Sequence, residues 1–198
     1  MKGVKSLANI TVNSRHAHSN GVEPGKTTMS TAATAIDERL DIVNENDEVV
    51  GSADKMEIYR DNLSHRIVHI LITNAKGEIA LQLRSREKRY LPGYWSTSVG
   101  GHVQSGEDYR AAARREAIEE LGVDLVFEEK GKYKYQTEAQ TKQLALFHAT
   151  CDGPYKIGTE EVERVAYFSP EAIQKLVDNG EKIHPELCFL LRKLGIIR

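Results

Sequence analysis

The sequence has few of the features that mark membrane, secreted and nucleic-acid-binding proteins. No apolar run approaches the length needed to cross a bilayer, so we expect no membrane partner. The formal net charge is -2 and no long block of Lys or Arg occurs, so we expect no double-stranded nucleic acid partner. The only cysteines are Cys151 and Cys188, without CxxC spacing, so neither a disulfide framework nor a zinc knuckle is indicated. We expect both to be buried apolar side chains in a reducing compartment.

The length and the texture of the chain indicate one domain. A chain of 198 residues can bury one proper core but not comfortably two. Residues 1–36 are rich in Ser, Thr, Asn, Ala and Gly without sustained periodicity, which predicts a flexible N-terminal tail before a domain at residues 37–198. We expect a cytoplasmic protein. Organellar targeting by the tail, a start at Met29 and a homodimer are left open.

Short β-like runs separated by turns begin after the tail. Residues 40–43 and 48–51 flank a turn and predict a hairpin, as do the apolar residues 65–73 and 78–85 around a second turn. Further strands are predicted near residues 124–137, 143–150 and 162–168, and helices at residues 106–121, 170–178 and 185–194. The connections are short and strands outnumber helices, which favours an α/β fold with helices flanking a sheet over a doubly wound parallel sheet.

The helix at residues 106–121 has clear end signals. Ser105 and Asp108 have the spacing of a capping box, with Ser105 accepting from the first turn. Four alanines within the segment favour a helix and close approach to a sheet. Gly122 can take the left-handed conformation that ends the helix.

Three like charges crowd one side of this helix. Glu116, Glu119 and Glu120 fall within an arc of about 100°, so their carboxylates repel one another unless a cation lies between them. A solvated charged face is one explanation, and a site for a hard divalent cation is the other. Arg115 precedes Glu119 by four residues and can pair with it. Glu107 should project away from the cluster and pin the helix entrance.

The spacing of these residues decides between the two explanations. Gly101 is followed after five residues by Glu107 and, seven residues later, by the run Arg115-Glu116-Ala117-Ile118-Glu119-Glu120-Leu121-Gly122-Val123. Such a match arises by chance with a probability on the order of one in ten million. The chain therefore resembles the Nudix hydrolases, from about Asp37 to residue 195. The resemblance implies an α/β/α sandwich with a mixed sheet and a loop-helix-loop metal site.

The resemblance also implies an activity and its residues. It makes Glu116, Glu119, Glu120 and a backbone carbonyl at Gly101, or at its neighbour Gly100, ligands of Mg²⁺ or Mn²⁺. Arg115 and Glu116 are the expected catalytic residues, with Glu116 as the base, and Glu107 and Gly122 support the site. The implied reaction is hydrolysis of a diphosphate linkage in a small nucleoside diphosphate derivative or related molecule. A later-loop glutamate is the alternative base, and the candidates are Glu160, Glu161 and Glu163.

A rival function comes from a subgroup of the same family. Residues 41–51, 64–85 and 91–103 resemble isopentenyl diphosphate isomerases, which need a cysteine where this chain has Gly100. The carboxylates expected on a later strand are replaced by Gln140 and Lys142. A glycine cannot transfer a proton, so we expect a hydrolase rather than an isomerase. A binding-only domain is a third alternative, which the complete carboxylate set disfavours.

The remaining polar residues before the signature give weaker expectations. His65 and His102 either bind a second metal ion or act as hydrogen-bonded histidines that orient the loop, and the loss of the acids favours the second reading. Arg84, Arg86 and His102 are candidate substrate-binding residues. Trp95, beside Pro92, is expected in the core.

Overall fold

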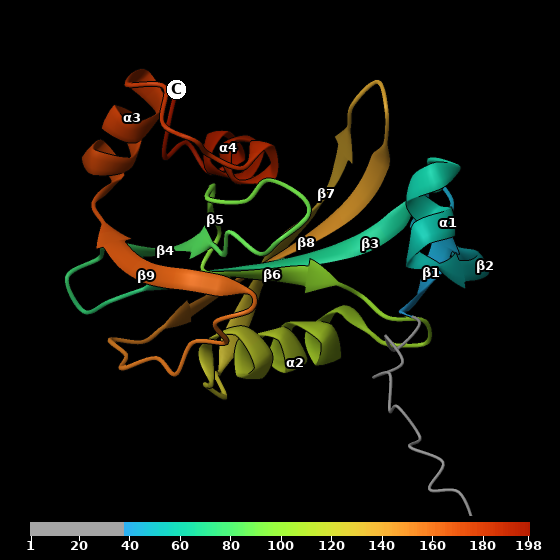
Figure 1. The fold of residues 1–198 in the computed structure, drawn as a ribbon, viewed down its shortest axis with the longest axis horizontal. Coiled ribbons are helices and arrows are strands. Elements are labelled where there is room, and N and C mark those ends of the chain that lie inside the picture. Colours follow the sequence, from blue (N-terminus) through green and yellow to red (C-terminus); the bar gives the residue numbers. More distant parts are fainter. Residues whose placement is uncertain (1–37) are drawn as a thin grey trace, which may run out of the picture. The chain divides into compact units, whose positions relative to one another are not determined.

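A mixed seven-stranded sheet with helices on both faces is the centre of the structure (Figure 1). The computed structural model describes residues 38–198, so the predicted tail and Met29 lie outside the described residues. The strands are β1 (Arg39–Val43), β2 (Val49–Asp54), β3 (His65–Thr73), β4 (Ile79–Arg84), β5 (Trp95–Ser96), β6 (Val99–His102), β7 (Phe127–Gln136), β8 (Thr141–Thr150) and β9 (Val162–Phe168). The helices are α1 (Lys55–Arg60), α2 (Tyr109–Leu121), α3 (Pro170–Asp178) and α4 (Pro185–Lys193).

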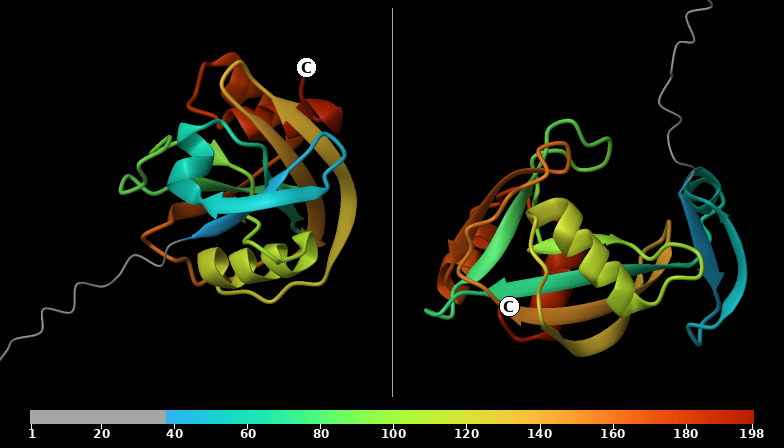
Figure 2. Two further views of the ribbon diagram at one scale, coloured as in Figure 1. Left: turned by 90° about the vertical axis from the view of Figure 1, so that its right-hand side faces the viewer. Right: turned by 90° about the horizontal axis from the view of Figure 1, so that it is seen from below.

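The sheet is mixed because its central strand has neighbours of both directions. Strand β3 pairs in parallel with β8 and antiparallel with β4 and β6. Strand β7 extends the sheet beyond β8, and β4 carries β5 and β9. Helix α2 lies across one face, while α3 and α4 lie on the opposite side (Figures 1 and 2). The predicted α/β/α sandwich with a mixed sheet is confirmed.

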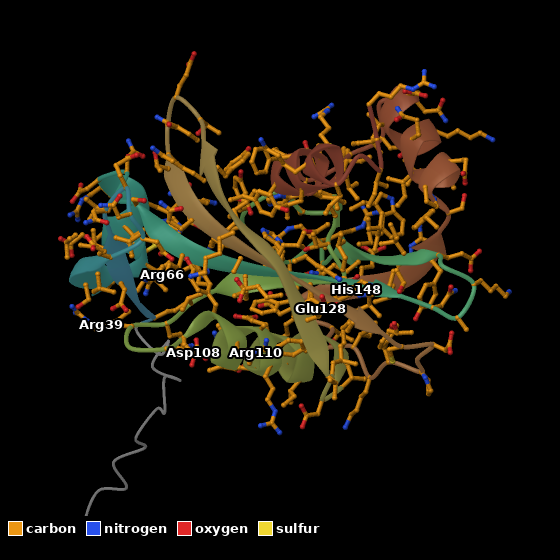
Figure 3. All side chains as sticks on the ribbon, turned by 180° about the vertical axis from the view of Figure 1, so that it is seen from behind. Arg39, Arg66, Asp108, Arg110, Glu128 and His148 are labelled. Atoms are coloured by element: carbon orange, nitrogen blue, oxygen red, sulfur yellow. The ribbon has the colours of Figure 1, made fainter. Side chains whose placement is uncertain are left out.

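Two apolar clusters, one on each face, hold the helices to the sheet. The alternating side chains of β3 divide between them, as the period of a strand requires. Val68 and Ile70 pack with the small Ala113 of α2, while Ile67 packs with Leu187 of α4. Arg110 extends from α2 (Figure 3). It donates to the carbonyl oxygen of Phe127, the first residue of β7, at 2.9 Å. The predicted core position of Trp95, in the α4 cluster, is confirmed.

The central hairpin forms as predicted but opens immediately. Strands β3 and β4 pair only at two positions, Ile72 with Ala80 and Thr73 with Ile79. Beyond them β6, which the sequence analysis did not predict, takes the edge of β3 and pairs residues 99–102 with residues 67–70. The β1–β2 hairpin is confirmed and forms a separate two-stranded sheet. The divergence of β3 and β4 therefore places the glycine-rich β6 in the middle of the sheet.

Helix α2 begins three residues later than expected. The N-cap is Asp108, whose side chain accepts from the backbone N–H of Ala111 at 2.8 Å. The predicted capping role of Ser105 is wrong, because its hydroxyl donates to Asp41 of β1 at 2.6 Å. The following Gly106 has a positive φ of 79°, which interrupts helical geometry before Asp108.

A short helix escaped sequence analysis. Helix α1 follows β2 directly, with Asp54 as N-cap accepting from the backbone N–H of Glu57 at 2.9 Å. Only Ile58 of its six residues is buried, so the segment lacks the repeated apolar spacing by which longer helices are recognised.

The two cysteines differ in part from expectation. Cys151 and Cys188 are free, as predicted, but both are half-buried rather than buried. Each touches one of the two apolar clusters from its edge. In the described part of the chain no helix has the length and apolar character to cross a membrane.

Gly122 ends α2 in the left-handed conformation, with φ 66°, as predicted. A Cβ there would lie 2.9 Å from both the Cβ and the carbonyl oxygen of Lys156. Gly77 has a similar φ of 77°, but a Cβ on it would meet nothing within 4 Å. An alanine at Gly77 therefore introduces the backbone strain alone, whereas an alanine at Gly122 introduces the strain and the clash with Lys156. We expect Gly77→Ala to lower the free energy of unfolding by about 1 kcal/mol and Gly122→Ala by about 2–4 kcal/mol. Equal losses in urea unfolding would contradict this account.

Candidate active site

The loop between β6 and α2 brings the signature residues together. Pairing with β3 fixes β6 beside α2, and the alanine face of α2 packs closely on the sheet. The glycines of β6 therefore face the glutamates of α2 across a very short gap.

Gly101 leaves room for the carboxylate of Glu116. A Cβ at Gly101 would lie 2.1 Å from Cδ of Glu116, far inside van der Waals contact. The side chain of Glu116 is 13% exposed. Burial raises its pKa to about 7, against the opposing effect of Arg115. Any residue larger than glycine at this position would push the carboxylate away.

Glu120 is the most deeply buried of the three clustered glutamates. It accepts hydrogen bonds from the backbone N–H of Gly100 at 3.1 Å and from Nε2 of Gln82 at 3.2 Å. Burial, and then repulsion by Glu116, raise its pKa to about 8. Within residues 38–198 it has no ion-pair partner, and the more distant charge of Lys88 opposes the rise in its pKa only in part.

Arg115 organises the other acidic groups. Its Nη1 donates to Glu116 at 2.6 Å and to Glu119 at 3.1 Å, which is the pairing expected from the helical spacing. Its Nη2 donates to the carbonyl oxygen of His102 at 2.9 Å and to Glu107 at 3.0 Å. One guanidinium thus links the helix to the loop that precedes it.

Glu107 lies differently from the helical projection. It pins the loop as predicted, accepting from the backbone N–H of Gln104 at 3.1 Å. Its carboxylate nevertheless turns toward Arg115 rather than away from the cluster. The helical angle does not apply to it, because α2 begins only after Asp108.

The arrangement of the carboxylates fits a divalent cation. Glu119 is 56% exposed, and among the described residues no three acidic, histidine or cysteine side chains converge into a complete ligand shell. Two further features provide the test of fit. Glu116 occupies the cradle at Gly101, and Glu120 is a buried carboxylate beside it without a cation. Hard oxygen donors with uncompensated charge are the donor set that Mg²⁺ and Mn²⁺ favour.

The three later-loop glutamates that are candidate bases differ in their exposure and in their partners. Glu160 is exposed, and Glu163 pairs with Arg86 at 3.2 Å. Glu161 pairs with Lys88 and is half-buried, and its charge contributes to the raised pKa of Glu120. Among the three candidates, Glu161 therefore faces the carboxylate cluster.

The two histidines named from the sequence do come together. Their rings stack with centroids 5.6 Å apart. His102 Nε2 lies 2.8 Å from the hydroxyl of Tyr59, and its Nδ1 lies 3.3 Å from Glu38. His65 Nδ1 bonds the carbonyl oxygen of Leu63 at 3.0 Å. Both are hydrogen-bonded histidines, in line with the favoured expectation for them.

The two candidate substrate-binding arginines, Arg84 and Arg86, have different partners. Arg84 donates to the carbonyl oxygens of Tyr90 at 2.9 Å and Leu91 at 3.3 Å, so it holds the loop after β4. Arg86 has a side chain that is 79% exposed and pairs only with Glu163 in the described residues. A role in binding substrate stays a prediction for both.

One residue at the site was missed by sequence analysis. Gln82 on β4 donates to Glu120. It lies in no motif and reaches the site only because β4 packs beside α2, so no local pattern signals it. Glu186 on α4 was also missed, and it is buried beside His69 and Lys142 on the opposite face of the sheet.

Comparison with known sequences finds a matching family model and several similar proteins. The model of the NUDIX domain matches residues 63–188. An uncharacterised Nudix hydrolase of Yersinia pestis is 36% identical over 145 residues, covering 73% of this chain and 80% of that protein. The Nudix hydrolase YfcD of Escherichia coli K12 is 35% identical over 151 residues, covering 76% and 84%. Isopentenyl-diphosphate Delta-isomerase 1 of Photorhabdus laumondii is 32% identical over 154 residues, covering 73% and 87%.

Comparison with solved structures agrees with the fold. The crystal structure of DR0079 from Deinococcus radiodurans matches with a TM-score of 0.70 at 31% identity, covering 79% of this chain and 98% of that chain. The MutT protein of Methanosarcina mazei matches with a TM-score of 0.53 at 25% identity, covering 61% and 85%.

The cradle at Gly101 makes a prediction that separates the site from the fold. Gly101→Ala should displace only the flexible end of Glu116, so the melting temperature should stay near that of the wild type. The affinity for Mn²⁺, measured by electron paramagnetic resonance, should fall about 10- to 100-fold. The control is Gly51→Ala, whose Cβ would meet Ile42 at an ordinary 3.5 Å. Wild-type Mn²⁺ affinity in a folded Gly101→Ala protein would refute the assignment.

Proposed function

Because the chain belongs to the NUDIX domain family, we propose that it is a hydrolase that cleaves a diphosphate linkage with the aid of Mg²⁺ or Mn²⁺. The observation that carries the proposal is Glu120, a buried carboxylate without a cationic partner in the described chain, set beside Glu116 in its glycine cradle. The proposed substrate is a small nucleoside diphosphate derivative or a related diphosphate.

In this proposal some residues of the site hold the cation and others fix the directions of those ligands. Glu116, Glu119, Glu120 and the carbonyl of Gly101 hold the cation. The bound cation supplies Lewis-acid stabilisation of charge that grows on the phosphate oxygens as the P–O bond breaks. Arg115 fixes the directions of Glu116 and Glu119, and its bond to the carbonyl of His102 keeps the loop in register with α2. Glu107 in turn fixes Arg115.

We assign the general base to Glu116. Its carboxylate would accept the proton of the attacking water, and Arg115 at 2.6 Å favours the ionised form that this task requires. Glu161 is the competing base, because it alone among the later-loop candidates faces the cluster. Its pairing with Lys88 favours a structural role.

The isomerase alternative lacks its chemistry at two positions. Gly100 has no side chain to transfer a proton. Lys142 donates to Glu186 at 2.8 Å, so the place of an expected carboxylate is taken by a cation. The isomerase relative therefore supports a shared fold and not a shared reaction. A binding-only role is disfavoured by the complete set of carboxylates.

The first test is Glu120→Gln. Turnover should fall by about 10²- to 10³-fold, because the substitution removes a charge that holds the cation. The melting temperature in EDTA should be unchanged or higher, since burial disfavours the ionised carboxylate that glutamine replaces. Hydrolysis is measured as phosphate or monophosphate released from nucleotide sugars, dinucleotides, nucleoside di- and triphosphates and CoA. Glu129→Gln, at an exposed position of β7, is the control. Near-normal turnover in Glu120→Gln would refute the metal assignment.

A second test locates the base. At saturating Mg²⁺, Glu116→Gln should lower kcat by about 10²-fold or more and also weaken Mn²⁺ binding, because Glu116 has both tasks. Glu161→Gln should lower kcat less than about tenfold, and Glu160→Gln should leave it unchanged. The base lies in the later loop instead if Glu161→Gln lowers kcat as strongly as Glu116→Gln while Mn²⁺ affinity stays at the wild-type value.

A further inference from the structure

A groove lies between α4 and β7, on the face of the sheet opposite α2. There the β7–β8 hairpin extends beside α4 (Figures 1 and 2). The groove has a volume of about 630 Å³ and is lined by Tyr135, Pro185, Cys188, Phe189, Arg192 and Lys193. The α4 residues among them follow one another at the spacing that forms a single stripe of a helix. None of these residues belongs to the signature or to the proposed hydrolytic machinery.

This stripe is an additional side of α4, next to the side that packs on the sheet. Leu187, Leu190 and Leu191 are fully buried and attach the helix to the core. Phe189 packs against the same core from its edge and stays half-buried. Tyr135 is half-buried as well, because alternate residues of β7 face α4 while those between them face solvent. The groove therefore offers apolar surface that residues 38–198 leave uncovered.

The two aromatic rings of the groove meet at an angle. The ring centroids of Tyr135 and Phe189 are 5.1 Å apart and the ring planes are inclined at 70°. In this edge-to-face arrangement the rings cover each other only in part, so both keep surface in the groove. Such a pair provides a place where a planar ring can pack.

The charged residues that line the groove are both cations. Lys193 Nζ lies 5.5 Å from the ring centroid of Phe189, and no acidic side chain of the described structure pairs with it. Arg192 donates through Nε to the backbone oxygen of Arg198 at 3.1 Å. The two terminal nitrogens of its guanidinium have no acceptor among the described residues. Free donors on two cations at the rim of an apolar groove favour an oxyanion.

The closest acidic influence on the groove comes from beneath it. Burial, and then the charge of Glu186, raise the pKa of Tyr135. Glu186 is only 5% exposed, however, and it accepts from Lys142 Nζ at 2.8 Å. Its charge is matched inside the protein, so it leaves the positive charge of the groove in place.

The size of the groove and its two kinds of lining residue select the occupant. The volume is in the range of small-molecule sites, roughly 300–1,000 Å³, and is too small for a long stretch of polypeptide or nucleic acid. A nucleotide combines a planar base with a phosphate. We propose that the groove binds a free nucleoside monophosphate, whose base packs against Tyr135 and Phe189 and whose phosphate takes the free donors of Arg192 and Lys193. This accessory site lies across the sheet from the glutamates of α2, and its binding does not rest on the proposed hydrolysis.

The test measures binding of AMP to the full chain in EDTA by isothermal titration calorimetry, with UMP as a second base. EDTA removes any nucleotide held through a cation at the glutamates. Adenosine lacks the phosphate and ribose 5-phosphate lacks the base, so each should bind at least about tenfold more weakly than AMP. Nuclear Overhauser effects between the adenine protons of AMP and the ring protons of Tyr135 and Phe189 should locate the base.

Two pairs of variants separate the groove from its surroundings. Lys193→Met should weaken AMP binding at least about tenfold, whereas Lys175→Met removes the same charge from α3, outside the groove, and should leave it unchanged. Tyr135→Leu should also weaken it about tenfold through the loss of the aromatic face. Its control is Tyr133→Leu, on the same side of β7 and also near Phe189, with ring centroids 6.4 Å apart, but outside the groove lining.

Several outcomes would overturn the proposal. Ribose 5-phosphate or adenosine that binds as tightly as AMP does so, as does equal AMP affinity in Tyr135→Leu and Tyr133→Leu. Missing Overhauser effects to the two rings in the wild type decide against it without any variant, so misfolding cannot protect it. A dimer in sedimentation that Lys193→Met dissociates and AMP does not would assign the groove to a second copy of the chain. Glu120→Gln should lose hydrolysis and keep AMP binding, which separates failure of this site from failure of the proposed hydrolase.

Discussion

The contact between Gly101 and Glu116 is the constraint on which the site depends. Because β6 has no side chain at this position, α2 can lie so close to the sheet that the carboxylate of Glu116 fills the space of a missing methyl group. The alanines of α2 make the same approach possible along the rest of the helix. The consequence is electrostatic. Close packing removes water from Glu116 and Glu120, and desolvation disfavours their ionised forms.

Arg115 offsets part of that cost. It pairs with Glu116 and Glu119 while its remaining donors tie α2 to Glu107 and to the carbonyl of His102. A single guanidinium can do this because its donors form a planar fork that reaches several acceptors at fixed angles. It does not reach Glu120, which has only Gly100 and Gln82 as partners in the described structure. The imbalance left at Glu120 would favour a bound cation there, as the proposed function requires.

The sequence predicted those parts of the fold and site that depend on near neighbours. The apolar run of β3, the cluster of glutamates on α2 and the left-handed Gly122 are local patterns, and the structure confirms the strand, the helix and its end. The start of α2 was misplaced because Asp41, from a distant strand, takes Ser105 out of its capping role. Strand β6 exists only because β3 and β4 diverge, which no run of four residues reveals. Glu186 reaches His69 across 117 residues of sequence, so only the folded chain brings it to the sheet.

The glycine at position 100 affects both the chemistry that the site can perform and the packing of β6 against β3. A side chain there would press on the hydrogen bond between His69 and Thr97, since its Cβ would lie 3.0 Å from His69 Nδ1 and 3.2 Å from the hydroxyl of Thr97. A cysteine at this position could transfer a proton but would press on the contact between His69 Nδ1 and the hydroxyl of Thr97. Glycine removes the proton carrier and leaves room for the buried imidazole of His69 beside β6. The absence of the isomerase cysteine and the packing of His69 against β6 are therefore two effects of one residue.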